Sequence, residues 1–224
     1  IEDFRGRFTG KTDYEIYTWA YQQYWQRCSK DLIIWLGGEH GTVMIPGVAD
    51  FGMMKKVFFT DLSARETDTL EYGLTRKLLS EMKPLSQVMG WHSYKKDMEE
   101  EWVTVTSSFG LGVEGLHNLP NTSFLYRVPA TPGFKYKNHH NVEPGKTYTP
   151  ENKVYLALVQ TDGLGLGAWV KPGRGSIPYA WETSMKFSYL SPAMLEYFYS
   201  QATPNDFFIG ALSGSSYMYP KAFP

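Results

Sequence analysis

Carboxylates at the ends of apolar runs are the residues of this chain best suited to chemistry. Hydrolysis by acid–base catalysis can use two carboxyl groups, one protonated to release the leaving group and one ionised as nucleophile or base. Asp162 ends the strongest strand-like run, Val154–Asp162, and Asp61 lies in a second run, Val57–Leu62. Glu182 could supply the second carboxylate instead, because the ring of Trp181 would favour the protonated form of a neighbouring carboxyl. We therefore predict catalytic roles for Asp162, Asp61 and Glu182.

Each catalytic prediction has a structural alternative. Asp162 could cap a helix or bond its own loop, and Asp61 could form an ion pair with Arg65. Asp206 precedes an apolar run, at the opposite end of a strand from the predicted sites, and is most simply a turn residue.

Six further residues are predicted to contact a ligand because they follow or end predicted strands. The loops at the carboxyl ends of parallel strands are where α/β proteins build their sites. These residues are Glu39, His92, Trp181, Gly214, Ser216 and Tyr217. Small residues let the backbone approach a ligand, and aromatic rings offer flat apolar faces.

A metal site formed by Asp61, Asp162 and His92, as in deacetylase-like barrels, is the minority interpretation. The chain has no Glu-x-x-His or His-x-x-x-His spacing, and the adjacent His139 and His140 cannot both face one ion from a strand. The sequence therefore predicts no metal and no cofactor.

The segment Gly214-Ser-Ser-Tyr-Met-Tyr-Pro220 resembles the motif that names the GxGYxYP family, with Ser216 in place of the second glycine. Further blocks resemble the family in order and spacing, so that the resemblance covers most of residues 55–220: Phe58–Leu62, Asn121–Phe124, Arg174–Trp181, Ser191–Tyr199 and Ala202–Phe208. The resemblance implies a glycoside hydrolase, a carbohydrate substrate, a secreted or extracellular location and a chain that is a fragment of a longer protein.

Apolar runs of strand length alternate with helical patterns, which indicates βα units and a mostly parallel sheet. The expected helices are 13–27, 67–82, 98–109 and 192–202, and the expected strands are 32–36, 57–62, 86–91, 123–127, 154–162, 177–181 and 207–212. This order predicts one (β/α) barrel-like domain over residues 1–224, incomplete or trimmed, with an irregular excursion at about 130–153.

Composition limits the classes of partner. A formal net charge of -1 provides no basic field for nucleic acid, and no apolar run is long enough to span a bilayer. Cys28 is the only cysteine, which excludes an intrachain disulfide. Aromatic residues reach 16%, an excess found both in carbohydrate-handling proteins and in aromatic cores. A non-catalytic carbohydrate-binding or structural module is therefore the competing function, and the sequence leaves the oligomeric state open.

Overall fold

The structure is a computed structural model that describes residues 2–37, 46–115, 121–139, 143–161, 165–210, 213–214 and 216–224. Its contacts divide the chain into two compact units. The first unit comprises residues 1–123 and 217–224, and the second unit comprises residues 124–216. Each unit is described by itself.

The first unit is built on a parallel four-stranded sheet. Its strands are β1 (Leu32–Leu36), β2 (Phe58–Thr60), β3 (Gln87–Trp91) and β4 (Gly112–Glu114), in the spatial order β2-β1-β3-β4. Ile33 of β1 is in register with Phe58 of β2 and Val88 of β3, and Val88 is in register with Val113 of β4. These four side chains therefore share one face of the sheet, because side chains alternate along a strand.

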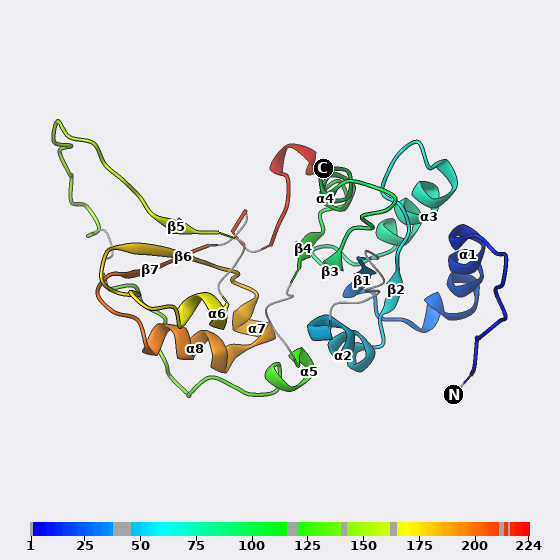
Figure 1. The fold of residues 1–224 in the computed structure, drawn as a ribbon, viewed down its shortest axis with the longest axis horizontal. Coiled ribbons are helices and arrows are strands. Elements are labelled where there is room, and N and C mark those ends of the chain that lie inside the picture. Colours follow the sequence, from blue (N-terminus) through cyan, green and yellow to red (C-terminus); the bar gives the residue numbers. More distant parts are fainter. Residues whose placement is uncertain are drawn as a thin grey trace. The chain divides into compact units, whose positions relative to one another are not determined.

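Helices cover both faces of this sheet. They are α1 (Asp13–Tyr24), η1 (Trp25–Arg27), α2 (Pro46–Lys55), α3 (Thr69–Ser80) and α4 (Glu99–Ser107). The core on the Ile33 face includes Leu74 and Leu78 of α3 and Trp102 of α4. On the opposite face α2 approaches so closely that a Cβ on Gly52 would lie 2.2 Å from the Ile34 side chain. Figure 1 shows α3 and α4 on one side of the sheet and α2 on the other.

Local sequence explains where these helices begin and end. The hydroxyl of Thr12 accepts a hydrogen bond from the backbone of Glu15, whose carboxylate accepts one from the Thr12 backbone. This reciprocal pair satisfies amides at the start of α1 that the helix itself leaves unpaired. At the start of α4, the Met98 amide donates to Glu101, and three glutamates in the first turn complement the helix dipole.

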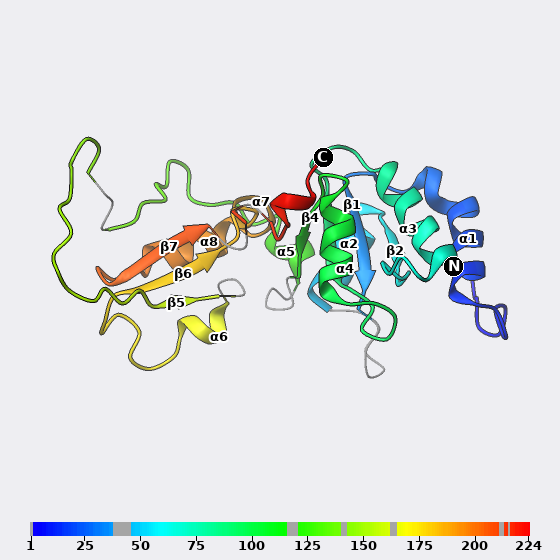
Figure 2. The ribbon, with the colours of Figure 1, turned by 90° about the horizontal axis from the view of Figure 1, so that it is seen from above.

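The second unit contains a parallel three-stranded sheet in the order β5-β6-β7 (Figure 2). Its elements are α5 (Thr122–Leu125, which starts at the end of the first unit), β5 (Val159–Gln160), α6 (Leu166–Trp169), β6 (Tyr179–Thr183), α7 (Phe187–Leu190), α8 (Pro192–Ser200) and β7 (Asp206–Gly210). Trp181 and Phe208 are paired in register and pack against Trp169 of α6 and Phe198 of α8. Helices α6 and α8 therefore cover one face of this sheet. The last element, η2 (Pro220–Ala222), belongs to the first unit.

Most of the predicted elements are confirmed, including the helices at 13–27, 67–82, 98–109 and 192–202 and the strands at 32–36, 57–62 and 86–91. The described part of the excursion at 130–153 contains no helix or strand. The side chain of Asn138 anchors it, because its amide donates to the Phe208 carbonyl and accepts from the Phe208 amide.

Two predicted strands are wrong in whole or in part. Residues 123–127 begin in the short helix α5, where the amide and hydroxyl of Ser123 both donate to Asp50. In the described part of the run, residues 154–161, only Val159–Gln160 is a strand, while Val154 is 96% exposed and Leu156 is 82% exposed. An apolar run predicts burial only where another element covers it, and these side chains have little cover.

Parallel sheets and an α/β architecture agree with the prediction, whereas the barrel stays a prediction. A regular barrel places consecutive strands side by side, but β1 here lies between β2 and β3. The single-domain expectation is likewise untested, because the placement of the two units relative to each other is not described. Among the described residues, no helix has the length and apolar character that crossing a membrane requires.

Candidate functional site

The topology of the first unit marks a binding position at the carboxyl ends of β1 and β3. Helix α2 follows β1 on one face of the sheet, and α3 precedes β3 on the other face. The connection that leaves β1 and the connection that enters β3 therefore lie on opposite faces of the sheet. Open α/β sheets bind ligands outside the carboxyl ends of the strands at such a switch point. A Cβ on Gly37, after β1, would lie 3.3 Å from the Cβ of Trp91, the last residue of β3. We call this place the switch-point edge.

Asp61 and His92 both lie at the switch-point edge. Asp61 follows β2 and His92 follows β3, two strands that run parallel on either side of β1. Ser93, next to His92, donates from its Oγ to Oδ2 of Asp61 over 3.1 Å. The structure therefore brings together the segments that carry these two predicted residues.

An ion pair between Asp61 and Arg65 was the predicted structural alternative. In the structure, the Nε of Arg65 donates to both carboxylate oxygens of Glu101, each at 3.2 Å. Glu101 raises the pKa of the Arg65 guanidinium by this bonding. The carboxylate of Asp61 therefore faces Ser93 rather than being held by Arg65.

His92 is buried and bonded through one ring nitrogen. Its Nδ1 lies 2.9 Å from Oδ1 of Asp97, and the two side chains are 6% and 0% exposed. The other oxygen of Asp97 accepts a hydrogen bond from the Ala64 amide over 2.6 Å. A tight turn makes this pair possible, because the amides of Lys96 and Asp97 both donate to the Ser93 carbonyl.

Lys96 ties the loop after β3 to its neighbours. Its ammonium donates to the backbone carbonyl of Asp61 over 2.7 Å and to the carboxylates of Asp13 and Glu71. Burial lowers the pKa of Lys96, but the bonds to Asp13 and Glu71 outweigh it, so the pKa lies above its ordinary value. The charged ammonium therefore fixes the backbone that carries Asp61.

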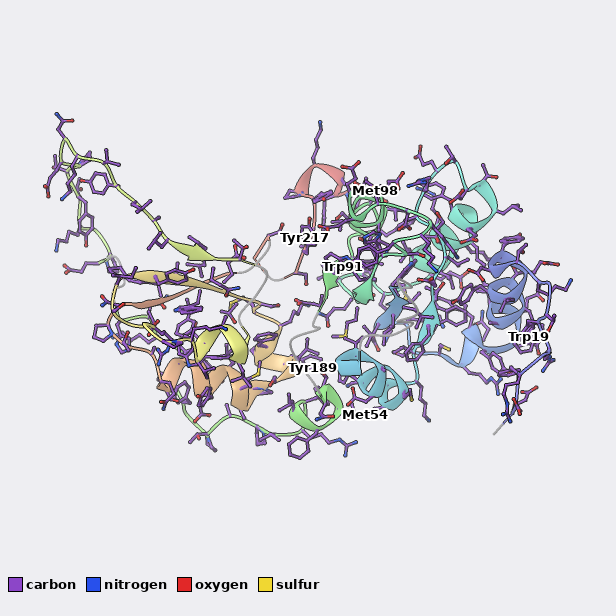
Figure 3. The ribbon with its side chains drawn as sticks, viewed as in Figure 1. Trp19, Met54, Trp91, Met98, Tyr189 and Tyr217 are labelled. Carbon is purple, nitrogen blue, oxygen red and sulfur yellow. The ribbon has the colours of Figure 1, made fainter. Side chains whose placement is uncertain are left out.

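Tyr217 completes the first unit beside β4. Its amide and carbonyl pair with Val113 in an antiparallel bridge, and its ring lies nearly parallel to that of Trp91, with centroids 6.5 Å apart (Figure 3). The hydroxyl donates to Glu99 over 2.7 Å and lies 3.2 Å from the Tyr219 hydroxyl. Burial, Tyr219 and Glu99 all raise the pKa of Tyr217. These are contacts of a packing residue, and contact with a sugar stays a prediction.

The backbone before Tyr217 has the conformation expected of a tight loop. Gly214 has a φ of +96°, which favours a residue without a Cβ, and Ser213 has a φ of +62°. Ser216 is 4% exposed, and its backbone is not one of those with a positive φ among the described residues. The replacement of the family's second glycine by Ser216 therefore requires no left-handed backbone.

The predicted residues of the second unit lie in its sheet. Trp181 is 6% exposed within the aromatic core and donates from its indole to Asp206, so its ring is enclosed rather than presented as a sugar platform. Glu182 lies within β6, not after it, and is paired in register with Ile209. Its Oε2 is buried and has no hydrogen-bond partner within the part of the chain that the structure describes.

Two predicted residues, Asp162 and Glu39, lie outside the described residues, as do His40 and His140. Separations between Asp162 and the other carboxylates are therefore not described. Within the described ranges, no group of three or more potential metal ligands is present.

Sequence reasoning missed Ser93, Lys96, Asp97 and Glu99, the polar residues that hold the switch-point edge together. The first three follow the predicted strand 86–91 closely, and Glu99 lies at the start of the predicted helix 98–109. Position after a strand is therefore a signal that extends beyond His92 to the residues of the following loop.

The fold defines an α/β protein with parallel sheets, and its switch-point edge carries polar and aromatic side chains. Two family models match the chain: the "GxGYxYP third domain" over residues 30–126 and the "GxGYxYP putative glycoside hydrolase C-terminal domain" over residues 152–224. The chain belongs to the GxGYxYP family.

A solved structure described as a putative hydrolase from Bacteroides thetaiotaomicron VPI-5482 has a similar fold, with a TM-score of 0.74 and 20% sequence identity. The match covers 92% of this chain and 39% of that chain, so the present chain spans about two fifths of the length of that protein. No curated protein matches the chain in sequence.

Proposed function

We propose that this chain is part of a glycoside hydrolase that acts on an oligosaccharide or polysaccharide. The observation that carries the proposal is the switch-point edge of a GxGYxYP domain, where Asp61, His92 and the rings of Trp91 and Tyr217 lie on segments bonded to one another. Carboxylates supply the acid and base of glycoside hydrolysis, and aromatic rings stack on sugar faces.

Asp61 and Asp162 are the proposed carboxylates, with Glu182 as the alternative partner. The bond from Ser93 and the fixed backbone carbonyl give Asp61 a defined orientation at the switch-point edge. Glu182 is the alternative because its Oε2 is a buried acceptor without a hydrogen-bond partner among the described residues. Paired carboxyl groups about 5–10 Å apart would permit retaining or inverting hydrolysis.

The competing function is carbohydrate binding without turnover. It is favoured by the bonding of Asp61 to Ser93, a contact that would also suit a structural aspartate. Turnover and retention of glycans are therefore measured separately.

The test compares the chain with Asp61→Asn, Asp162→Asn and Glu182→Gln on an array of defined glycans. Loss of at least about a hundredfold in turnover, with glycan retention kept, is expected for each residue that acts as acid, base or nucleophile. Asp31→Asn is the control, because Asp31 forms an exposed ion pair with Lys83. Full turnover in both Asp61→Asn and Asp162→Asn would refute the catalytic proposal, and retention without turnover in the unmodified chain would establish the binding function.

A further inference from the structure

The buried pair of His92 and Asp97 has a feature that packing alone does not explain. Nδ1 of His92 is bonded to Asp97, and the second Asp97 oxygen is occupied by the Ala64 amide. Both oxygens of the carboxylate are thus used, one by a ring and one by the backbone. Such a pair fixes the plane of the imidazole.

The partners of Asp97 also determine which nitrogen of His92 carries a proton. An ionised carboxylate can only accept hydrogen bonds, so Nδ1 must be the donor. In the neutral ring the lone pair then lies on Nε2. The fixed plane therefore gives this lone pair a fixed direction.

Nε2 of His92 has no hydrogen-bond partner among the described residues. The His92 side chain as a whole is 6% exposed. An unprotonated ring nitrogen is a hydrogen-bond acceptor, so Nε2 is the position of this pair that a ligand hydroxyl could use.

Aromatic rings pack against the ring of His92. The ring of Tyr94 lies 4.4 Å from that of His92, centroid to centroid, and Tyr94 is 48% exposed. The ring of Trp91, the residue before His92, lies 6.1 Å from the ring of His92, centroid to centroid. An acceptor nitrogen beside an exposed ring matches a sugar, which presents hydroxyl donors at the rim of an apolar face.

We propose that Asp97 is a positioning residue that presents Nε2 of His92 as the acceptor for a carbohydrate hydroxyl, with Tyr94 as the ring beneath the sugar. The choice of a carbohydrate rests on the proposed function, whereas the orientation of His92 does not. The two parts are therefore tested by different measurements.

The orientation is tested without any ligand. Long-range ¹H–¹⁵N spectra of the full chain should show Nδ1 of His92 protonated and Nε2 unprotonated in the neutral ring. In Asp97→Ala this preference should be lost, since the carboxylate that selects it is absent. A neutral ring protonated at Nε2 in the unmodified chain would overturn the proposal, whatever happens in the variant.

Access to Nε2 is tested by diethylpyrocarbonate, which acylates unprotonated imidazole nitrogen, followed by mass spectrometry. His92 should be modified, with the exposed His139 as the positive control. Modification of His139 with none at His92 would show that Nε2 is enclosed and would overturn the proposal.

The sugar contact is tested by isothermal titration with cellohexaose, xylohexaose and chitohexaose. His92→Asn keeps a donor near the Nδ1 position but removes Nε2, and should weaken binding about five- to tenfold, as expected for one hydrogen bond. His92→Gln, whose amide reaches the Nε2 position, should lose less. Equal affinity of His92→Asn and the unmodified chain would overturn the sugar contact, whereas absence of binding by the unmodified chain would overturn both this contact and the proposed function, leaving the tautomer result unaffected.

Discussion

Asp206 is the single residue that most clearly organises the second unit. Its Oδ2 accepts hydrogen bonds from Arg174 at 2.6 Å and from the amide and hydroxyl of Thr203, each at 2.8 Å, while Oδ1 accepts from the Trp181 indole at 2.8 Å. Burial raises the pKa of Asp206, but the bonds from Thr203 and Trp181 and the charge of Arg174 outweigh it, so its pKa is below the ordinary value. The sequence interpretation of Asp206 as a turn residue accounts only for its bonds to Thr203.

Asp206→Asn should reduce the stability of the second unit by about 2 kcal/mol at pH 7, because the ion pair with Arg174 and at least one good acceptor are lost. The folded pKa of Asp206 lies below its unfolded value, so its contribution is complete above the unfolded pKa of about 4 and disappears as pH falls through the folded pKa. The difference between unmodified and variant chains should therefore shrink below about pH 4, as measured by urea unfolding across pH.

Glu151→Gln is the control for Asp206→Asn within the same unit. Glu151 pairs with Lys153, but its side chain is 73% exposed, so its loss should change stability by less than about 0.5 kcal/mol. A difference between the unmodified chain and Asp206→Asn that stays constant from pH 7 to pH 3 would contradict the assigned pKa direction.

At the scale of elements, the sequence predicted what local periodicity and caps determine. The ranges expected to be helical, 13–27 and 67–82, contain α1 and α3, and the α3 residues Leu74 and Leu78 are buried. Helix α2 was missed because Gly47 and Gly52 lower helix propensity, although Gly52 is what lets the helix approach Ile34. The role of Asp97 was missed because its contact with His92 forms only when the turn that starts at Ser93 brings the two side chains together.

Strand β3 depends on one glycine near its carboxyl end. Gly90 has a φ of +91°, and a Cβ there would lie 1.9 Å from the carbonyl oxygen of Trp35 on β1. Gly90→Ala should therefore destabilise the first unit by about 3 kcal/mol or more, because the strained backbone and the clash both oppose folding. Urea unfolding followed by tryptophan fluorescence measures the loss.

Gly73→Ala supplies the matched control for Gly90→Ala. Gly73 is exposed within α3, and nothing lies within 4 Å of a Cβ placed there. Alanine should increase stability by about 0.5–1 kcal/mol, since glycine is a poor helix former. Similar effects of the two substitutions would show that the close approach at Gly90 does not constrain the sheet.

At the scale of the whole chain, the family domains and the compact units have different boundaries. The match to the C-terminal domain extends over residues 152–224, but residues 217–224 pack in the first unit. The motif Gly214–Pro220 is therefore where the chain leaves the second unit and returns to the first. Sequence similarity could identify this segment but not its partner, since the pairing of Tyr217 with Val113 joins residues more than a hundred positions apart.

The return segment should stabilise the edge of the first sheet. Removal of residues 217–224 deprives the Val113 amide of its acceptor, the Tyr217 carbonyl, at 3.0 Å, and leaves Glu99 without the Tyr217 hydroxyl. An edge strand that loses its neighbour exposes its amides to water. Hydrogen exchange at Val113 should therefore accelerate at least tenfold, corresponding to about 1.4 kcal/mol, while Ile34 in the central strand changes less. Tyr217→Phe keeps the backbone bridge and should leave Val113 protected, so equal exchange of Val113 in the truncated and unmodified chains would show that the family motif does not stabilise β4.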